Sequence, residues 1–225
     1  MSDPLNVLVW SEETAPKDAY PNGINATVAE HLNEQNRIVA RATGIEAPEQ
    51  GVGEDDLDWA DVLFWWGHLR HDDVTEETVD RVETAVREDG LGFVALHSAH
   101  YARPFTRLLG TSGDLGEARW EDPGEPEIIE VEAPNHPIAD GVDDFALPET
   151  EMFGEPFDVP EPDDVVCRST FPEGGEFRSV VTFTFGAGRG AYVRPGHETF
   201  RIYHHPSIRE ILTNAALWAG SGANS

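Results

Sequence analysis

Short apolar runs alternate with segments of helical periodicity over the first 110 residues. The continuous runs are typical of strands buried on both faces of a sheet, and they cover residues 5–10, 38–42, 61–66 and 92–96. Helices are predicted between and after them, over residues 25–32, 73–90 and 103–109. Asn25 is expected to cap the first helix, and Asp73 with Glu76 to form a capping box at the second. This alternation predicts right-handed βαβ units and an α/β protein with a mostly parallel central sheet.

The second half of the chain has a stronger β pattern. β-Branched and aromatic residues predict strands over residues 127–132, 164–169, 179–185 and 190–194. Glycines between the last two strands predict a hairpin, whereas the Gly-, Pro- and acid-rich residues 110–126 predict a surface loop. A final helix is predicted from Pro206 to Gly220. We therefore expect one domain over residues 1–220 and a disordered tail over 221–225.

The charge balance of the chain is strongly acidic. There are 43 acidic and 15 basic residues, and Lys17 is the only lysine. Such a surface repels phosphate backbones, so no nucleic-acid partner is expected. The acidic residues are spread among regular apolar periods, and this lysine-poor composition resembles halophilic proteins, in which high salt screens the repulsion. The charge therefore indicates habitat rather than function.

The apolar runs and the single cysteine limit the compartment and the chemistry. The runs are strand-sized, and no charged-then-apolar leader opens the chain, so we expect a cytoplasmic protein without a membrane partner. Cys167, which lies in a predicted strand, is the only cysteine of the chain. An intramolecular disulfide and a cysteine-based metal site are therefore excluded. A homo-oligomer is compatible with the sequence, although no apolar edge locates an interface.

Seven of the nine histidines fall in three short stretches, each beginning where a predicted strand ends. They are His68 and His71, His97 and His100, and His197, His204 and His205. In an open parallel sheet the carboxyl ends of the strands form the ligand crevice, so these stretches are expected to meet there. This convergence is the basis of the predicted site.

Neutral imidazole is both a common metal ligand and a general acid–base near neutral pH. We expect a divalent metal such as zinc to be held by His68, His97 and His197, with Glu198 as a carboxylate ligand. Catalytic proton transfer is expected from His97, His100, His197 and Glu198. An isolated histidine is more often structural, and the spacing lacks the helical His-Glu-x-x-His signature, so the interpretation depends on the shared position at strand ends.

Aromatic and charged residues near the same strand ends are candidates for binding a small sugar derivative. The predicted substrate-binding residues are Trp66, His71, Tyr101, Glu151 and Arg194. Aromatic faces suit the apolar face of a sugar ring, and an arginine suits an oxyanion. The alternative is that Arg194 pairs with Glu151 or Glu155 in the fold. His136 is expected to belong to a turn that places Ile138 in the core.

Four ordered motifs carry a family resemblance. They are Trp65-Trp66-Gly67-His68-x-x-His71, Gly92-Phe93-Val94-Ala95-Leu96-His97-Ser98-Ala99-His100, His136-Pro137-Ile138-x-x-Gly141 and Arg194-Pro195-Gly196-His197-Glu198-Thr199. Together, from Val7 to Trp218, they resemble the ThuA-like (trehalose utilisation) family. The resemblance implies a flavodoxin-like three-layer sandwich of the class I glutamine amidotransferase-like type, and a role in carbohydrate metabolism.

The resemblance also implies that the amidotransferase reaction is lost. In true amidotransferases a nucleophilic cysteine stands at the elbow after a central strand, where this chain has His97-Ser98-Ala99-His100. Relatives often carry histidines after the first strand and in a Gly-Ile-His segment, whereas this chain has residues 11–14 and Gly23-Ile24-Asn25 there.

The sequence is compatible with three functional hypotheses. The first is an isomerase, lyase or hydrolase acting on a sugar or keto-sugar derivative by histidine proton transfer, with a divalent metal polarising a carbonyl. The second is a non-catalytic sugar-binding or regulatory protein on the amidotransferase-like scaffold. The third is a serine hydrolase using Ser98, although the flanking glycines of a nucleophile elbow are missing.

Overall fold

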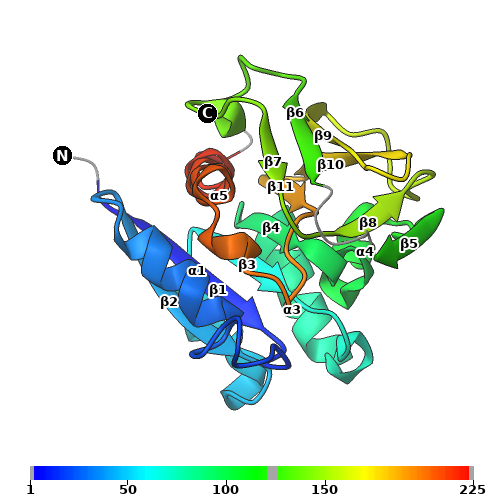
Figure 1. The fold of residues 1–225 in the computed structure, drawn as a ribbon. Coiled ribbons are helices and arrows are strands. Elements are labelled where there is room, and N and C mark those ends of the chain that lie inside the picture. Colours follow the sequence, from blue (N-terminus) through cyan, green and yellow to red (C-terminus); the bar gives the residue numbers. More distant parts are fainter. Residues whose placement is uncertain (1–2, 121–125, 223–225) are drawn as a thin grey trace.

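A computed structural model describes residues 3–120 and 126–222 of the chain. Within them, nine strands form one sheet in the order β2-β1-β3-β4-β11-β10-β9-β6-β7 (Figure 1). The parallel half consists of β2 (Ile38–Gly44), β1 (Leu5–Ser11), β3 (Val62–Trp66), β4 (Gly92–Leu96) and β11 (Gly188–Val193). The apolar runs of β3 and β4 are buried on both faces, as expected for parallel strands covered by helices, whereas the edge strand β2 has exposed residues such as Val39.

The register of three central strands places their carboxyl ends at one level. Trp66 pairs with Leu96 across β3 and β4, and Leu96 pairs with Val193 across β4 and β11. The loops that follow these strands therefore start side by side, although they are far apart in the sequence.

The other half of the sheet is antiparallel. It continues from β11 through β10 (Glu176–Phe185), β9 (Asp164–Thr170), β6 (Glu127–Val131) and β7 (Phe145–Leu147). A separate two-stranded ribbon pairs β5 (Glu117–Trp120) with β8 (Glu151–Gly154). This ribbon lies on the side of β10 and α4 in Figure 1, and it brings residues from the middle of the chain toward the ends of the parallel strands.

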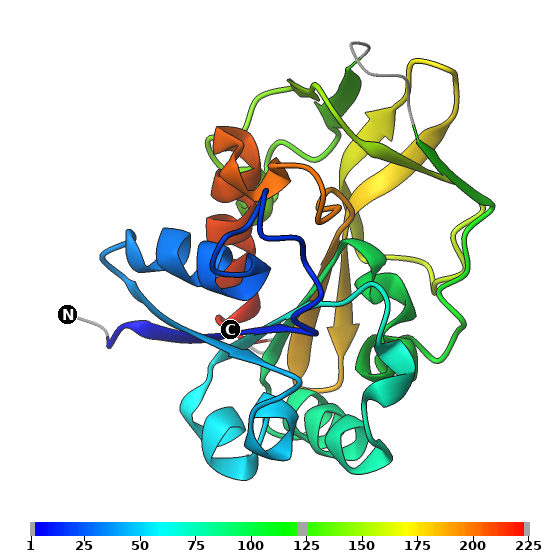
Figure 2. The same ribbon diagram turned by 60° about the horizontal axis from the view of Figure 1, so that its bottom comes forward.

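Helices cover both faces of the parallel half (Figure 2). One face packs against α1 (Ile24–Asn33) and α5 (Pro206–Ala219), and the other against α2 (Glu54–Trp59), α3 (Glu76–Arg87) and α4 (Arg103–Leu109). Successive side chains of β1 point to opposite faces of the sheet and so contribute to two hydrophobic cores. Val7 and Val9 belong to the core beneath α1 and α5, whereas Leu8 and Trp10 belong to the core on the other face. Burial of each such side chain is worth about 1.5–3 kcal/mol, so both layers are needed for stability.

Short 3-10 helices complete the described elements. They are η1 (Pro48–Gly51), η2 (His71–Asp73), η3 (His97–Tyr101), η4 (Pro137–Ala139) and η5 (Ile202–His204). Three of them, η2, η3 and η5, lie in the histidine-containing stretches, so these segments leave the strands as tight turns rather than as long helices.

The predicted α/β class, parallel core and β10–β11 hairpin are confirmed, and several details are corrected. Thr75, not Asp73, caps α3, because its side chain accepts a hydrogen bond from the backbone of Thr78. Asn25 lies inside the first turn of α1 and bonds to the carbonyl of Thr43 instead of capping the helix. The predicted loop 110–126 contains β5, and its residues 121–125, like residues 223–225 of the predicted tail, lie outside the described residues.

Candidate metal and proton-transfer site

The three loops that start side by side bring together four of the predicted site residues. His68 follows β3, His97 follows β4, and His197 and Glu198 follow β11. Each residue offers one ligand atom, and these four atoms all lie within 4.8 Å of one another. The expected convergence of distant imidazoles at the strand ends is therefore observed.

The three imidazole rings pack around a common point. The ring of His197 meets those of His68 and His97 edge-on, with centroids 5.1 and 5.2 Å apart, whereas His68 and His97 stack at 5.9 Å. His97 is fully buried and His197 is 5% exposed, whereas the His68 side chain is 23% exposed. The cluster is therefore sheltered from water except on the side of His68.

His97 occupies the elbow after the central strand in a left-handed conformation, with φ 53°. This conformation is costly for a residue with a side chain, and such strain is often found at functional positions. The Nδ1 of His97 donates to the carbonyl oxygen of Arg194 at 3.0 Å, because a carbonyl can only accept. The neutral ring therefore presents the lone pair of Nε2 to the site.

Glu151, from the start of β8, faces that lone pair. Its Oε2 lies 3.2 Å from His97 Nε2 and 4.0 Å from His197 Nε2. Neither His97 Nε2 nor Glu151 Oε2 makes a hydrogen bond within the described residues, although both atoms are buried. Two acceptors at this distance require a shared proton or a cation between them, since unpaired buried polar atoms are costly.

The other two imidazoles are held by hydroxyl and amide groups. His68 Nδ1 is hydrogen-bonded to Ser98 Oγ at 2.7 Å, and its Nε2 lies 3.9 Å from Glu198 Oε1. His197 Nδ1 accepts from the backbone amide of Thr199 at 3.2 Å. Glu198 Oε2 is buried and makes no hydrogen bond within the described residues. All three histidines are thus oriented by neighbouring groups rather than by packing alone.

Burial determines the ionisation of the site. It lowers the pKa of His97 well below the usual histidine value and that of His197 to about 4. It also raises the pKa of the Glu151 and Glu198 carboxyls, because the anions are taken out of water. Neutral imidazoles beside crowded carboxylates form a site that favours a cation or a retained proton.

Arg194 does not face the site, contrary to its predicted role in substrate binding. Its side chain is 1% exposed and forms a salt bridge with the fully buried Glu127. It also donates to the carbonyl oxygen of Glu151 at 2.7 Å. The alternative partner Glu155 instead pairs with Arg178. Arg194 therefore joins the two halves of the sheet and holds the segment that carries Glu151.

Trp66 is also a structural residue rather than a substrate platform. It is fully buried, and its indole nitrogen donates to the carbonyl of Gly196 at 3.1 Å, which fixes the loop before His197. Of the other predicted binding residues, Tyr101 is 42% exposed and packs its ring against His100 at 3.9 Å. His71 lies against Tyr101, outside the four-residue cluster.

A cavity of about 260 Å³ opens onto the cluster. It is lined by His68, Ser98, His100, Tyr101, Leu115, Glu117, Ala118, Glu151 and Phe153. His100 is predicted as catalytic, but it is buried, with its Nδ1 bonded to the carbonyl of Gly113 and its pKa lowered by burial to about 3. Leu115, Glu117, Ala118 and Phe153 were not predicted, because they come from the ribbon and the segment before it, which lack a clear strand pattern.

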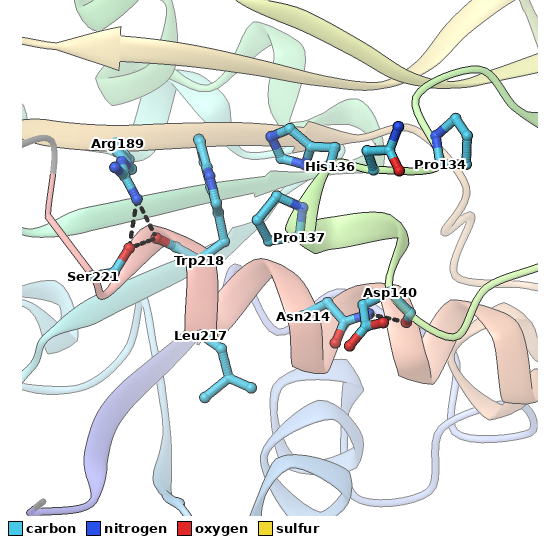
Figure 3. A pocket seen from close by; sticks show the side chains of 10 residues that line it. Pro134, His136, Pro137, Asp140, Arg189, Asn214, Leu217, Trp218 and Ser221 are labelled. Carbon is cyan, nitrogen blue, oxygen red and sulfur yellow. Dashed lines mark hydrogen bonds between the residues drawn. The ribbon is translucent and has the colours of Figure 1, made fainter. Parts of the chain in front are cut away.

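A larger cavity, of about 660 Å³, lies elsewhere, near the amino end of β11 (Figure 3). Its polar contacts have structural explanations. Arg189 donates to the carbonyl of Trp218 and so closes the carboxyl end of α5. Asn214 donates to the carbonyls of Ile138 and Asp140 and ties the η4 turn to α5. The predicted turn that buries Ile138 is confirmed, and it accounts for the motif at residues 136–141.

Among the described residues, none of the helices has both the length and the apolarity needed to cross a membrane.

Fold comparison first defines the class of protein. The structure matches that of PurLQS from Thermotoga maritima with a TM-score of 0.58 and 12% identity, and the match covers 96% of this chain and 99% of that chain. At this identity the likeness concerns the fold alone, which is that of the class I glutamine amidotransferase-like proteins. The ThuA family model, described as trehalose utilisation, matches residues 6–219, and the chain therefore belongs to the ThuA family.

Solved structures described as ThuA-like share this fold. One from Bacteroides uniformis is 19% identical, with 97% of this chain and 93% of that chain covered and a TM-score of 0.68. One from Parabacteroides merdae is 18% identical, with 97% and 91% covered and a TM-score of 0.70. No curated protein matches the sequence. Family membership connects the chain with carbohydrate utilisation and leaves its reaction to be proposed from the site.

Proposed function

We propose that this protein is a cytoplasmic enzyme of carbohydrate metabolism that acts on a sugar or keto-sugar derivative. In this proposal His68, His97, His197 and Glu198 hold a divalent metal such as zinc. One observation carries the proposal: one ligand atom from each of these four residues lies within 4.8 Å of the other three. A site built in this way is stabilised by a cation.

The residues present fit a divalent metal. Three imidazoles and a carboxylate form a donor set typical of zinc, and the low pKa values of His97 and His197 keep both rings uncharged at neutral pH. The bond from His97 Nδ1 to the Arg194 carbonyl is the outer contact that usually orients a metal-binding histidine. The Ser98 hydroxyl serves His68 in the same way.

Bound at this position, the metal would act as a Lewis acid that polarises a carbonyl or hydroxyl oxygen of the substrate. Glu151 is the group of this chain best suited to move a proton, because it lines the cavity and burial raises its pKa toward neutrality. Its backbone is fixed through Arg194, so its carboxylate stays next to His97. Tyr101 offers an exposed ring at the cavity wall for one face of a sugar.

The proposed chemistry does not include glutamine hydrolysis. The elbow that carries the nucleophilic thiol in amidotransferases holds His97 here. Cys167, the one cysteine of the chain, is buried in β9, and burial raises the pKa of its thiol to about 12. A thiol in this state is a poor nucleophile.

The test combines metal analysis with activity. Protein purified without chelator is examined for bound metal and assayed with neutral sugars and their keto derivatives, alongside His97→Ala, His197→Ala and Glu151→Gln. We expect stoichiometric metal in the wild type, loss of metal in the histidine variants, and metal retained with activity lost in Glu151→Gln. Wild-type protein that takes up no added Zn²⁺, Mn²⁺ or Co²⁺ would contradict the proposal. If the protein instead only binds sugars, the wild type would show no turnover, and these variants would lose only their affinity for the sugar.

Serine hydrolysis is a second candidate, supported by the 2.7 Å contact between Ser98 Oγ and His68 Nδ1 and by Glu198 beyond His68. The two functions require opposite hydrogen bonds. A metal on His68 Nε2 needs Nδ1–H to donate to Ser98, whereas a hydrolase needs the Ser98 hydroxyl to donate to Nδ1. Labelling by a fluorophosphonate that is abolished in Ser98→Ala would favour the hydrolase. Turnover that survives in Ser98→Ala would exclude it.

A further inference from the structure

Glu12 is a buried carboxylate that takes no part in the proposed chemistry. It follows β1 directly and is 1% exposed, although acidic residues are rarely buried without a specific partner. Its neighbour Glu13 is exposed, so burial is specific to position 12.

The partners of this carboxylate belong mainly to the loop that carries His68. Glu12 Oε1 accepts from the backbone amide of Leu69 at 2.7 Å and from the Thr14 hydroxyl at 2.5 Å. Glu12 Oε2 accepts from the backbone amide of Arg70 at 2.8 Å. Burial acts to raise the pKa of this carboxyl, yet these hydrogen bonds outweigh it and leave the pKa lowered. Glu12 is therefore an anion that is bonded at both oxygens.

The approach of Glu12 also determines the shape of the loop. A Cβ added at Gly67 would lie 3.3 Å from Glu12 Oε2 and 3.3 Å from the His71 ring, so the loop passes close to the carboxylate. The amides of residues 69 and 70 immediately follow His68, so Glu12 holds the backbone next to the residue from which this side chain projects. Without an acceptor at this position, both backbone amides would lose their partner within the protein.

We propose that Glu12 is a positioning residue that holds the loop of residues 67–71 so that His68 Nε2 faces Glu198. This inference rests on the proposed metal site for its consequence, since a misplaced His68 would remove one of four ligands. Outer contacts of this kind change metal affinity by about 10–100-fold in proteins. Glu12 is neither one of the residues that line the cavity nor one of the four clustered ligands, and its hydrogen bonds go to the loop that carries His68. Its charge also acts on the nearby carboxyl of Glu198, and Glu12→Asp retains that charge.

The experiment compares Glu12→Gln and Glu12→Asp with the matched control Glu13→Gln in metal-free protein. Co²⁺ is the probe, followed by its visible absorption, and hydrogen exchange of the Leu69 and Arg70 amides reports on the loop without metal. We expect Glu12→Gln to weaken Co²⁺ binding about tenfold or more and to speed exchange at both amides. Glu12→Asp should fall between it and the wild type, and Glu13→Gln should change neither quantity by more than twofold.

The outcomes separate this inference from the proposed function. Wild-type affinity for Co²⁺ in a folded Glu12→Gln variant overturns the positioning role. If the wild type binds no Co²⁺, the proposed metal site fails, and the role of Glu12 is then read from the ring ¹⁵N signals of His68. A change in those signals in Glu12→Asp, relative to Glu13→Gln, supports positioning, and unchanged signals overturn it. Glu12→Asp also serves if the glutamine variant does not fold.

Discussion

Replacing Glu127 by glutamine should destabilise the protein more than any loss of a surface ion pair. Glu127 is fully buried and accepts from Arg194, from the Ser169 hydroxyl and from the Thr150 hydroxyl. The glutamine keeps the volume and one acceptor oxygen but leaves the Arg194 guanidinium without a counter-charge. Breaking a buried pair in this way costs about 3–5 kcal/mol, which for a chain of this size lowers the melting temperature by about 6–20 °C.

The assay is thermal unfolding followed by circular dichroism at fixed salt, with Glu132→Gln as the control. Glu132 pairs with Arg168 at the surface and its side chain is 38% exposed, so its loss should cost less than about 1 kcal/mol. Because Arg194 also holds the Glu151 carbonyl, Glu127→Gln should reduce activity as well. The control is expected to shift the melting temperature by only about 2 °C. If the two variants melt within that interval of each other, the idea that the Arg194–Glu127 pair joins the halves of the sheet is wrong.

Three further predictions concern protonation, space and reactivity. Burial lowers the pKa of His100 to about 3 and of His197 to about 4, so between pH 6.5 and pH 4 the unfolded chain binds protons that the native state does not. The free energy of unfolding measured with urea should therefore fall as the pH falls, by up to about 1.4 kcal/mol per pH unit for each histidine. The raised pKa values of the buried carboxyls oppose part of this fall. A free energy of unfolding that does not change with pH over this range would contradict the prediction. Gly196→Ala should lower the melting temperature and weaken Co²⁺ binding, because a Cβ there would lie 2.0 Å from the Tyr203 hydroxyl; a normal melt would refute the clash. Cys167 should react with a disulfide reagent only after denaturation, and rapid labelling of native protein would show that β9 opens.

The fold could largely be predicted from the sequence, because its core strands are continuous apolar runs. Residues 61–66 and 92–96 became β3 and β4 almost without change of bounds. The meeting of His68, His97 and His197 followed from one rule, that parallel strands end on the same side of a sheet. These predictions needed only local patterns and the handedness of βαβ units.

The partners of charged residues could not be predicted in the same way. Whether Arg194 meets substrate, Glu155 or Glu127 depends on how β6 and β8 pack, and their short runs carry little periodic signal. Glu12 is one of 43 acidic residues in the sequence, and only the three-dimensional path of the loop after β3 distinguishes it. Long-range polar contacts decide the details of the site, and no spacing in the sequence encodes them.

The common level at which β3, β4 and β11 end makes the proposed metal site sensitive to errors in strand alignment. A slip of one residue between two neighbours moves a loop by about 3.3 Å and turns its side chains to the opposite face. That shift is comparable to the 4.8 Å that encloses all four ligand atoms, so a slipped chain would lose the site. In refolding experiments, metal uptake would thus count only the molecules whose strands are correctly aligned. It would separate them from compact, misaligned forms that spectroscopy alone does not distinguish from the native state.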